Sequence, residues 1–353
     1  MKQYKVAIIG NGMICNAAHI PAYKAMGDKV KIVAVADIRE EAAKETAERH
    51  GIPKYYVDPY KMLEEEKPDI ISVCTPNAYH KEYTLAGFRA GCHVVCEKPV
   101  AVTCADAEEM FNAAEKAGKH LFVIQSLRFT GNFKAAAGLA KSGCLGDIYY
   151  ADLNLVRRRG VPRWGMFHMA KENVGGAFCD LGVHMCDYLM SISGNPKMVS
   201  VSGSAVTRIV NKEKNIEFSN AESGAPTGLF TPRKFDMKEF DVEEFANGYI
   251  RLENGMTVTF KISWALNLPN SNTVSICGDK GGLTIGDDGL KLLTTQGNYQ
   301  ADVLPRVFPR PIYGALRFHR PHPRDELHPE GPQRGNDHGG IPHPEGRGYE
   351  CGC

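Results

Sequence analysis

Short apolar runs alternate with amphipathic stretches through the first third of the chain. Val6 to Ile9 form one such run, and VKIVAVADI, PDIISVCTP, HVVCEKPV and HLFVIQSLRF follow. Runs of this kind are typical of strands that are buried on both faces of a parallel sheet. The stretches between them, such as REEAAKETAERHG and TCADAEEMFNAAEKAGK, have the spacing of surface helices. The alternation predicts an α/β fold with a doubly wound parallel sheet of the Rossmann type over residues 1–127.

The pattern changes after residue 127, where alternating strands are separated by turn signals at Asn254-Gly255, Asp279 and Asp287-Asp288. Such strands predict a mostly antiparallel sheet. We therefore expect a second, α+β domain over residues 128–305. Residues 211–240 read as a long polar excursion rather than as core.

Residues 306–353 are rich in Pro, Arg, His and Gly and have no helical period. Codons for DHGGIPHPEGRGYECG, read one base later, can spell the amphipathic sequence IMAVYRILKAAGMNVA. We hypothesise a frameshift upstream of this atypical segment, which leaves it disordered and deprives the second domain of its closing helices. Resequencing of the gene tests this.

Length and charge narrow the class of protein. The 353 residues are too many for a single hydrophobic core and indicate two domains. The 42 Lys and Arg balance 41 Asp and Glu, so the net charge does not favour binding to nucleic acid or to an anionic membrane. The 11 cysteines contain no C-x-x-C pair. We expect reduced thiols in a cytoplasmic protein without signal peptide or membrane span.

A glycine turn follows the first strand. Gly10 and Gly12 lie between that strand and a helical pattern, where the first glycine makes the turn and the second lets a dinucleotide pyrophosphate approach the backbone. Met13 and Ile14 continue the turn, and Cys15 replaces the usual third glycine.

Asp37 ends the second strand, 25 residues beyond Gly12. An acid at this offset holds the adenosine ribose 2′-hydroxyl and favours NAD; the alternative is a helix N-cap. Ile38 and Arg39 follow in the same site, and Arg39 can also meet a phosphate, so NADP remains compatible with the sequence.

Polar residues stand at the carboxyl ends of the next two strands. These are Thr75, Pro76 and Asn77 after one strand, and Glu97-Lys98-Pro99 after the other. Both groups therefore belong to the crevice in which ligands of doubly wound sheets bind.

A later helix carries a polar stripe. Asp180, His184 and Asp187 are spaced i, i+4 and i+7 beside an apolar stripe. We interpret the stripe as a proton relay and substrate clamp. A solvated face is one alternative. Metal ligation with His168 is another, which the expected chemistry does not need.

Four motifs in order resemble those of the Gfo/Idh/MocA family of oxidoreductases, over residues 4–305. They are G-x-G-M-I at Gly10, T-P-N-x-x-H ending at His80, E-K-P around Lys98, and D-x-G-x-H-x-x-D from Asp180. The resemblance implies a nicotinamide-dependent oxidation of a sugar, cyclitol or related polyol hydroxyl, or reduction of the matching ketone. It also implies that residues 128–305 form a large open sheet, which binds substrate and makes the contacts of a homodimer or homotetramer. It places His80 and Glu97 with the cofactor-binding residues, Glu97 as a structural or ribose-side hydrogen-bonding partner.

The resemblance also implies an active site of Lys98, Asp180 and His184 that contacts cofactor and substrate. Lys98 points at the nicotinamide, and an amine partly removed from water can exchange a proton near neutral pH. His184 hydrogen-bonds the reacting hydroxyl, and Asp180 orients the imidazole or binds a neighbouring hydroxyl. Whether Lys98 or His184 is the principal base stays open. Pro99, cis in many relatives, fixes the turn.

The segment RRRGVPRWGMFH lies near the substrate mouth in this family. Arg157 and Trp164 suit a polyol or an anionic substrate; a surface loop or a subunit contact is an equally good interpretation. Two other functions stay open: an NAD-dependent glycoside hydrolase, and a non-catalytic dinucleotide sensor. Intact Lys98 and His184 argue against the sensor.

Overall fold

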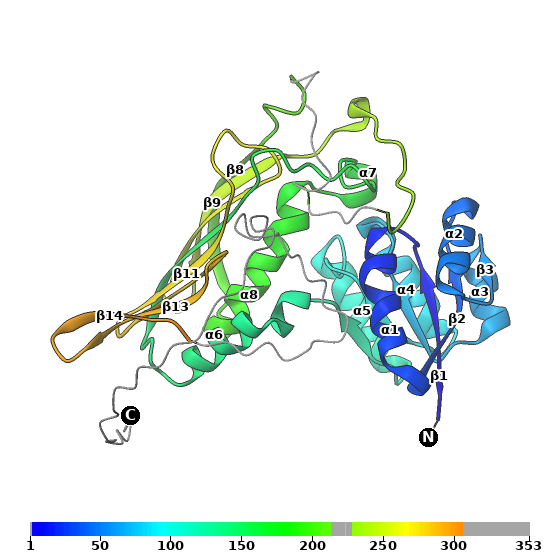
Figure 1. Ribbon diagram of the computed structural model, residues 1–353, viewed down its shortest axis with the longest axis horizontal. Helices are drawn as coiled ribbons and strands as arrows, with labels where there is room; N and C mark the ends of the chain where they lie inside the picture. Colours follow the sequence, from blue (N-terminus) through cyan, green and yellow to red (C-terminus); the bar gives the residue numbers. More distant parts are fainter. Residues whose placement is uncertain (1, 213–222, 224–227, 306–353) are drawn as a thin grey trace, which may run out of the picture. The chain divides into compact units, whose positions relative to one another are not determined.

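The computed structural model describes residues 2–212, 223 and 228–305, all within one compact unit that spans residues 1–316. It contains two sheets with helices packed against them (Figure 1). The predictions for the tail, residues 306–353, lie outside the described residues, as do residues 213–222 and 224–227 of the polar excursion at 211–240. Among the described residues, no helix is long and apolar enough to cross a membrane.

The first sheet has six strands in the order β3-β2-β1-β4-β5-β6, and every pair in it is parallel. The strands are β1 (Tyr4–Ile9), β2 (Val30–Ala36), β3 (Tyr55–Tyr56), β4 (Ile70–Val73), β5 (His93–Cys96) and β6 (Leu121–Val123). The helical segments are η1 (Cys15–His19), α1 (Ile20–Ala25), η2 (Gly27–Lys29), α2 (Glu40–His50), α3 (Pro59–Glu66), η3 (Asn77–Tyr79), α4 (His80–Arg89) and α5 (Cys104–Lys116). The predicted doubly wound sheet is confirmed.

Two separate apolar clusters explain why these strands read as continuous apolar runs. One joins the sheet to α3, α4 and α5, with Met62, Phe88 and Met110 at its centre. The other joins it to η1, α1 and α2 through Ile20 and Ala47. Both faces of the sheet are therefore buried, which is the condition for a parallel sheet in water.

The second sheet has eight strands in the order β14-β13-β12-β11-β7-β10-β9-β8. The strands are β7 (Ile148–Val156), β8 (Met198–Val206), β9 (Phe245–Leu252), β10 (Thr257–Ser263), β11 (Ser271–Gly278), β12 (Gly282–Gly286), β13 (Gly289–Gln296) and β14 (Tyr299–Val303). The helical segments are η4 (Ser126–Phe129), α6 (Gly131–Lys141), α7 (Ala170–Asn173), η5 (Phe178–Gly182), α8 (Val183–Ser193) and η6 (Met237–Glu239). All strand pairs are antiparallel except β7 with β10, so the prediction of a mostly antiparallel sheet is confirmed.

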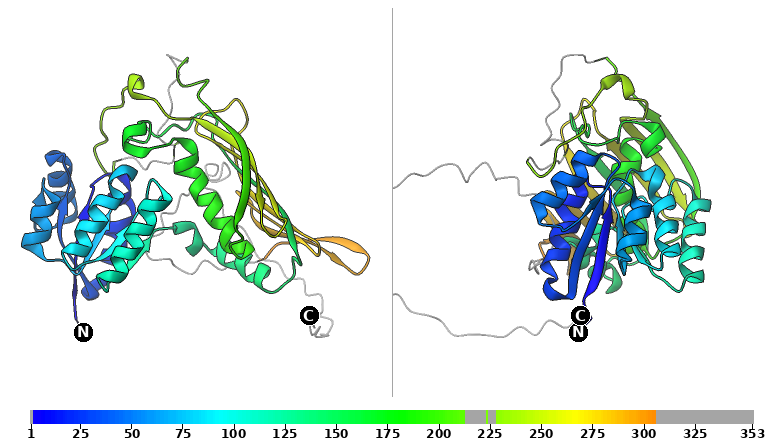
Figure 2. Two further views of the ribbon diagram at one scale, coloured as in Figure 1. Left: turned by 180° about the vertical axis from the view of Figure 1, so that it is seen from behind. Right: turned by 90° about the vertical axis from the view of Figure 1, so that its right-hand side faces the viewer.

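Helices cover one face of this second sheet. α6 and α8 lie along it (Figures 1 and 2) and bury Leu153, Ile262 and Ile276 against Met185 and Leu189. The alternate residues of β7, β10 and β11 point the other way and are largely Ser, Thr, Asp and Asn. The strict alternation follows from a sheet with a single core face.

Two helices begin with a π-helical turn, η1 before α1 and η5 before α8. The predicted stripe of Asp180 and His184 required a regular α-helix through both residues. Asp180 lies instead on the wider π-helical turn η5, whereas His184 lies on α8, so the two do not share an α-helical stripe. Such turns are rare and occur often at functional sites.

Candidate active site

The turn after β1 has the shape that a bound dinucleotide needs. Gly10 has φ +90°, and a Cβ there would lie 2.6 Å from the carbonyl carbon of Cys74, so the turn passes tightly against the end of β4. A Cβ on Gly12 would meet no atom within 4 Å, which leaves the backbone open to a phosphate. Met13 and Ile14 are half-buried at the start of the following helix. The turn therefore fits the pyrophosphate of NAD.

Asp37 is held in place by two backbone amides. Its carboxylate accepts hydrogen bonds from Asn11 N at 2.8 Å and from Arg39 N at 2.9 Å. The helix α2 has Arg39 as its N-cap without a side-chain bond, so the N-cap alternative for Asp37 is wrong. A carboxylate can accept about four hydrogen bonds, which leaves capacity for a ribose hydroxyl. Ile38 beside it is exposed.

The T-P-N loop makes other contacts than the sequence led us to expect. The Asn77 side chain is buried and donates to the carbonyl of Asn173, at the end of α7. His80 is completely buried, with its ring nitrogens 2.7 Å from the Pro99 oxygen and 3.0 Å from the Thr75 oxygen. We had expected the two side chains to contact the cofactor. The Asn77 amide nitrogen and both His80 ring nitrogens are engaged within the protein, so these side chains join the loops that surround the site.

Glu97 is buried and its carboxylate is shared between two donors. Oε1 lies 2.9 Å from His19 Nε2, and Oε2 accepts from the backbone amide of Lys98 at 3.2 Å. This arrangement agrees with the structural role predicted for Glu97 and not with the ribose-side role. The peptide bond between Lys98 and Pro99 is cis, as the resemblance implied.

Lys98 and Asp180 form an ion pair between residues 82 positions apart. Lys98 Nζ donates to the Asp180 carboxylate at 3.0 Å and to its backbone carbonyl at 2.9 Å. The Trp264 indole donates to the second carboxylate oxygen at 3.1 Å. Burial raises the pKa of Asp180, but the charges of Lys98 and Arg157 and the hydrogen bonds from Lys98 and Trp264 together outweigh burial, so this pKa lies below its usual value. Asp180 thus orients the Lys98 amine and not the imidazole.

His184 lies close enough to Lys98 to feel its charge. Burial, and then the charge of Lys98, lower the pKa of His184 to about 4. The imidazole is therefore neutral at neutral pH and can accept a proton or a hydrogen bond. Its Nδ1 is buried without a hydrogen-bond partner in the described part of the chain.

Two carboxylates fix the helix that presents these groups. Glu243 accepts hydrogen bonds from Gly176 N and Phe178 N, at the entrance to η5. Asp187 binds Arg128 through both of its oxygens, which ties α8 to η4. Asp187 therefore anchors α8. Glu243 and Arg128 carry no motif, and sequence reasoning missed them together with Trp264 and His19.

Arg157 lies close enough to Asp180 and His184 to affect both, whereas Trp164 is buried within its own loop. The Arg157 guanidinium donates to the carbonyl of Ser223 at 3.0 Å, and its charge lowers the pKa of both Asp180 and His184. Trp164 is buried, with its ring against Phe167 at 5.9 Å. We had expected Trp164 near the substrate mouth, with a surface loop or a subunit contact as the alternative; its ring is buried and packs within its own loop.

His168 does not join Asp180 and His184. Its ring is completely buried beside Phe235, and Nε2 lies 3.6 Å from Glu239. Over residues 2–212, 223 and 228–305, no three side chains of His, Cys, Asp or Glu are grouped as metal ligands would be. The nine cysteines in the same ranges are free thiols.

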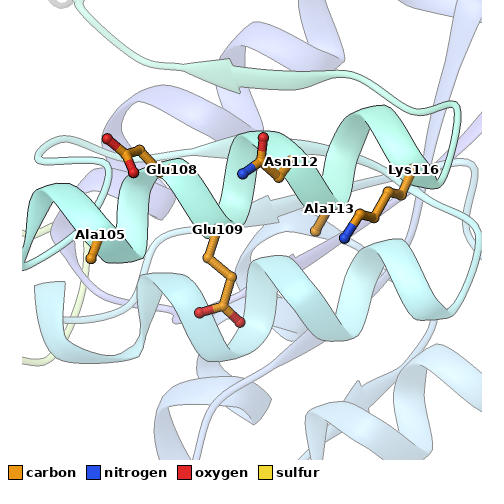
Figure 3. Close-up of a pocket in the computed structure, with 6 residues that line it drawn as sticks. All are labelled: Ala105, Glu108, Glu109, Asn112, Ala113 and Lys116. Carbon is orange, nitrogen blue, oxygen red and sulfur yellow. The ribbon is translucent and has the colours of Figure 1, made fainter.

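A hollow of about 390 Å³ runs along α5 (Figure 3), and no motif residue lines it. Its wall includes Glu108, Glu109 and Lys116, and Glu109 is paired with Lys81 at 2.6 Å. We regard it as a solvated helix face.

Comparison with known proteins gives two family matches. A model described as oxidoreductase family, NAD-binding Rossmann fold, matches residues 4–125, and the GFO/IDH/MocA C-terminal domain matches residues 133–284. The D-glucoside 3-dehydrogenase of Escherichia coli K12 is 36% identical over 283 residues, which are 80% of this chain and 76% of that protein. The myo-inositol 2-dehydrogenase of Thermotoga maritima is 30% identical over 190 residues, 54% of this chain and 55% of that one.

Solved structures agree with the fold. A levoglucosan dehydrogenase in complex with NADH superimposes with a TM-score of 0.70 at 21% identity, covering 86% of this chain and 79% of that one. An aldose-aldose oxidoreductase from Caulobacter crescentus superimposes with a TM-score of 0.68 at 24% identity, covering 88% and 85%.

Proposed function

Because this chain belongs to the Gfo/Idh/MocA family of NAD-binding oxidoreductases, we propose that it oxidises a ring hydroxyl of a D-glucoside or a closely related sugar or cyclitol. The reverse reaction reduces the matching ketone. The chain is an NAD-dependent dehydrogenase, and the D-glucoside class is taken from the relative that is 36% identical over 283 residues.

The observation that carries the proposal is the contact between Lys98 and Asp180. It brings the E-K-P loop of the parallel sheet and the η5 turn together, with both side chains 15% exposed or less. An amine, a carboxylate and a neutral imidazole in one partly buried place are the groups that proton transfer from a sugar hydroxyl needs.

Each residue then has a distinct task. NAD, held by the turn at Gly10 and Gly12 and by Asp37, would supply the acceptor for the hydride that leaves the carbon bearing the hydroxyl. His184 is neutral, so its imidazole takes the hydroxyl proton. Lys98 uses two hydrogen-bond donors on Asp180, and its third donor holds the same substrate oxygen in place. Asp180 fixes the amine by charge and by geometry, and Arg157 adds positive charge nearby.

The cofactor preference is proposed to be NAD over NADP. The Asp37 carboxylate lies at the end of β2, where a 2′-phosphate would meet its negative charge. Arg39 lies 3.8 Å from Asp37 and is drawn to it, which weakens its use as a phosphate ligand.

We also propose a cytoplasmic homodimer or homotetramer that associates through the open face of the second sheet. Residues 1–127 form the cofactor domain and residues 128–305 the substrate domain. Support comes from the family resemblance and from the polar, helix-free face of β7, β10 and β11.

The experiment is a panel of D-glucosides, free sugars and inositols with NAD or NADP, followed by absorbance of the reduced nicotinamide. Lys98→Ala and His184→Ala should each lose turnover by about 100-fold or more and still bind NAD. Lys116→Ala, on the solvated face of α5, is the matched control. Redox turnover with none of these substrates would refute the proposal, and glycoside cleavage without net redox change would favour the hydrolase alternative.

A further inference from the structure

A chain of buried hydrogen bonds ends at the residue before Lys98. Glu97 Oε1 lies 2.9 Å from His19 Nε2, His19 Nδ1 lies 3.2 Å from Ser72 Oγ, and Ser72 Oγ lies 2.7 Å from Tyr23 OH. We call these four side chains the Glu97 chain. It joins η1, α1, β4 and the end of β5, and the sequence analysis did not predict it.

Burial excludes a direct chemical role for this chain. Ser72 is completely buried, and the other three side chains are 6% to 8% exposed. Serine, histidine and glutamate in this order resemble a nucleophilic triad, but no substrate reaches a serine with no accessible surface. The chain must act through a neighbour.

That neighbour is the catalytic loop. The second oxygen of Glu97 accepts the backbone amide of Lys98, so the position of the carboxylate fixes the start of the Lys98 side chain. The groups that feel the charge of Glu97 are His19, Lys98, His80 on α4, His184 on α8, and the thiols of Cys74 and Cys96.

Among the neighbours of Glu97, His19 does most to stabilise the buried carboxylate in its ionised form. Burial raises the pKa of Glu97, but the hydrogen bond and charge of His19, with smaller help from Lys98, more than offset it, and the pKa lies below its usual value. A buried carboxylate without such a donor takes up a proton instead.

We propose that His19 is a positioning residue for the dehydrogenase reaction, which keeps Glu97 ionised and fixed and through it holds Lys98 beside His184. This inference rests on the proposed function for the roles of Lys98 and His184. The contact between His19 and Glu97 does not depend on that function.

Three variants isolate the contact: His19→Leu removes the donor, His19→Gln keeps a donor without the ring, and Glu97→Gln removes the carboxylate. His19→Leu should lower kcat by about 10- to 100-fold, the scale on which misplacement of a catalytic group acts, with little change in the KM for NAD. Glu97→Gln should lower kcat equally, and His19→Gln should recover most of the loss. Because His19 acts through Glu97, the double variant His19→Leu/Glu97→Gln should be no slower than Glu97→Gln alone.

Tyr23→Phe is the matched control, since it removes only the hydroxyl at the far end of the Glu97 chain. It should keep the wild-type kcat and pH profile. Equal losses in Tyr23→Phe and His19→Leu would indicate general damage to the domain and would overturn the assignment.

A spectroscopic readout does not depend on turnover. Infrared difference spectra between wild type and Glu97→Gln should show an ionised carboxylate for Glu97 at neutral pH, and the His19→Leu protein should show a carboxylic acid band that vanishes in the double variant. A protonated Glu97 in wild type, or an ionised one in His19→Leu, refutes the inference. The wild-type spectrum decides the matter even if His19→Leu does not fold. Absence of redox turnover in wild type would instead count against the proposed function alone.

Discussion

The ion pair between Lys98 and Asp180 allows a quantitative test of the site. Consider Lys98→Met, which keeps the unbranched shape and most of the length of the side chain and removes its charge. The Asp180 carboxylate then retains the Trp264 indole at 3.1 Å as its hydrogen-bond donor but loses an ammonium at 3.0 Å. At an effective dielectric constant of ~20, two unit charges at this distance attract by about 5.5 kcal/mol before desolvation is counted.

Desolvation removes part of this attraction. Lys98 is 15% and Asp180 13% exposed, so both ions lose most of their water on folding. The cost is several kcal/mol per ion, and the net worth of such a pair is small, whereas removal of one partner costs about 3–5 kcal/mol. We expect about 2–3 kcal/mol for Lys98→Met, because Trp264 and the charge of Arg157 still stabilise the carboxylate.

The assay is a double-mutant cycle with Lys98→Met, Asp180→Leu and the double variant, each unfolded in urea. The double variant should be at least about 1 kcal/mol more stable than the sum of the single losses predicts, because it leaves no buried charge alone. All three should lack turnover. A coupling energy near zero, or near-normal turnover in Lys98→Met, would refute the assignment of this pair as the centre of the site.

Three further predictions follow from the geometry. Gly10→Ala should unfold or strongly destabilise the protein, because the new Cβ would lie 2.6 Å from the Cys74 backbone. Gly12→Ala should keep the wild-type urea midpoint and lose NAD affinity, because its Cβ would meet no atom within 4 Å. Equal losses of stability in the two variants would contradict this. Asp37→Ala should reduce the preference for NAD over NADP by about tenfold or more, measured as the ratio of kcat/KM values, since a repulsive charge near a 2′-phosphate is removed; an unchanged ratio would count against the ribose role. The pKa of His184 is about 4 in the folded protein, against its ordinary value of 6.5 in the unfolded chain, so the unfolded chain binds this proton first and stability falls as the pH drops from 6.5 to 4. Between pH 6.5 and pH 4, the unfolding free energy of His184→Asn should fall by about 3 kcal/mol less than that of wild type. An identical pH dependence in the two proteins would show that His184 is not buried as a neutral ring.

Local chemistry along the chain was enough to predict the architecture of both sheets. Apolar runs of strand length indicate a strand that is buried on both faces, and alternation of apolar and polar residues indicates a strand that is buried on one face. Neither pattern depends on distant parts of the chain. The same holds for Gly10 and Gly12, whose role follows from the strand before them and the helix after them. It holds also for the loops at Thr75 and Lys98, since the carboxyl ends of parallel strands share one edge.

The partners of the site residues depended on tertiary structure. Trp264 reads in sequence as one more aromatic at the end of a strand, yet its indole binds Asp180, 84 residues away. His19 reads as a helix residue, and it meets Glu97 78 residues further on. His80 and Asn77 belong to a cofactor motif, yet the His80 ring nitrogens and the Asn77 amide nitrogen bind backbone oxygens of the protein itself.

The physical reason is the range over which each kind of information acts. Periodicity, turn preference and strand-end position are set by neighbours within about ten residues, and the sequence displays them directly. A hydrogen bond between two loops depends on how two sheets and a π-helical turn bring those loops together, to within a fraction of an ångström. Residue types alone name candidates such as Lys98, Asp180 and His184, and only the folded chain decides that the amine pairs with the carboxylate while the imidazole stays neutral.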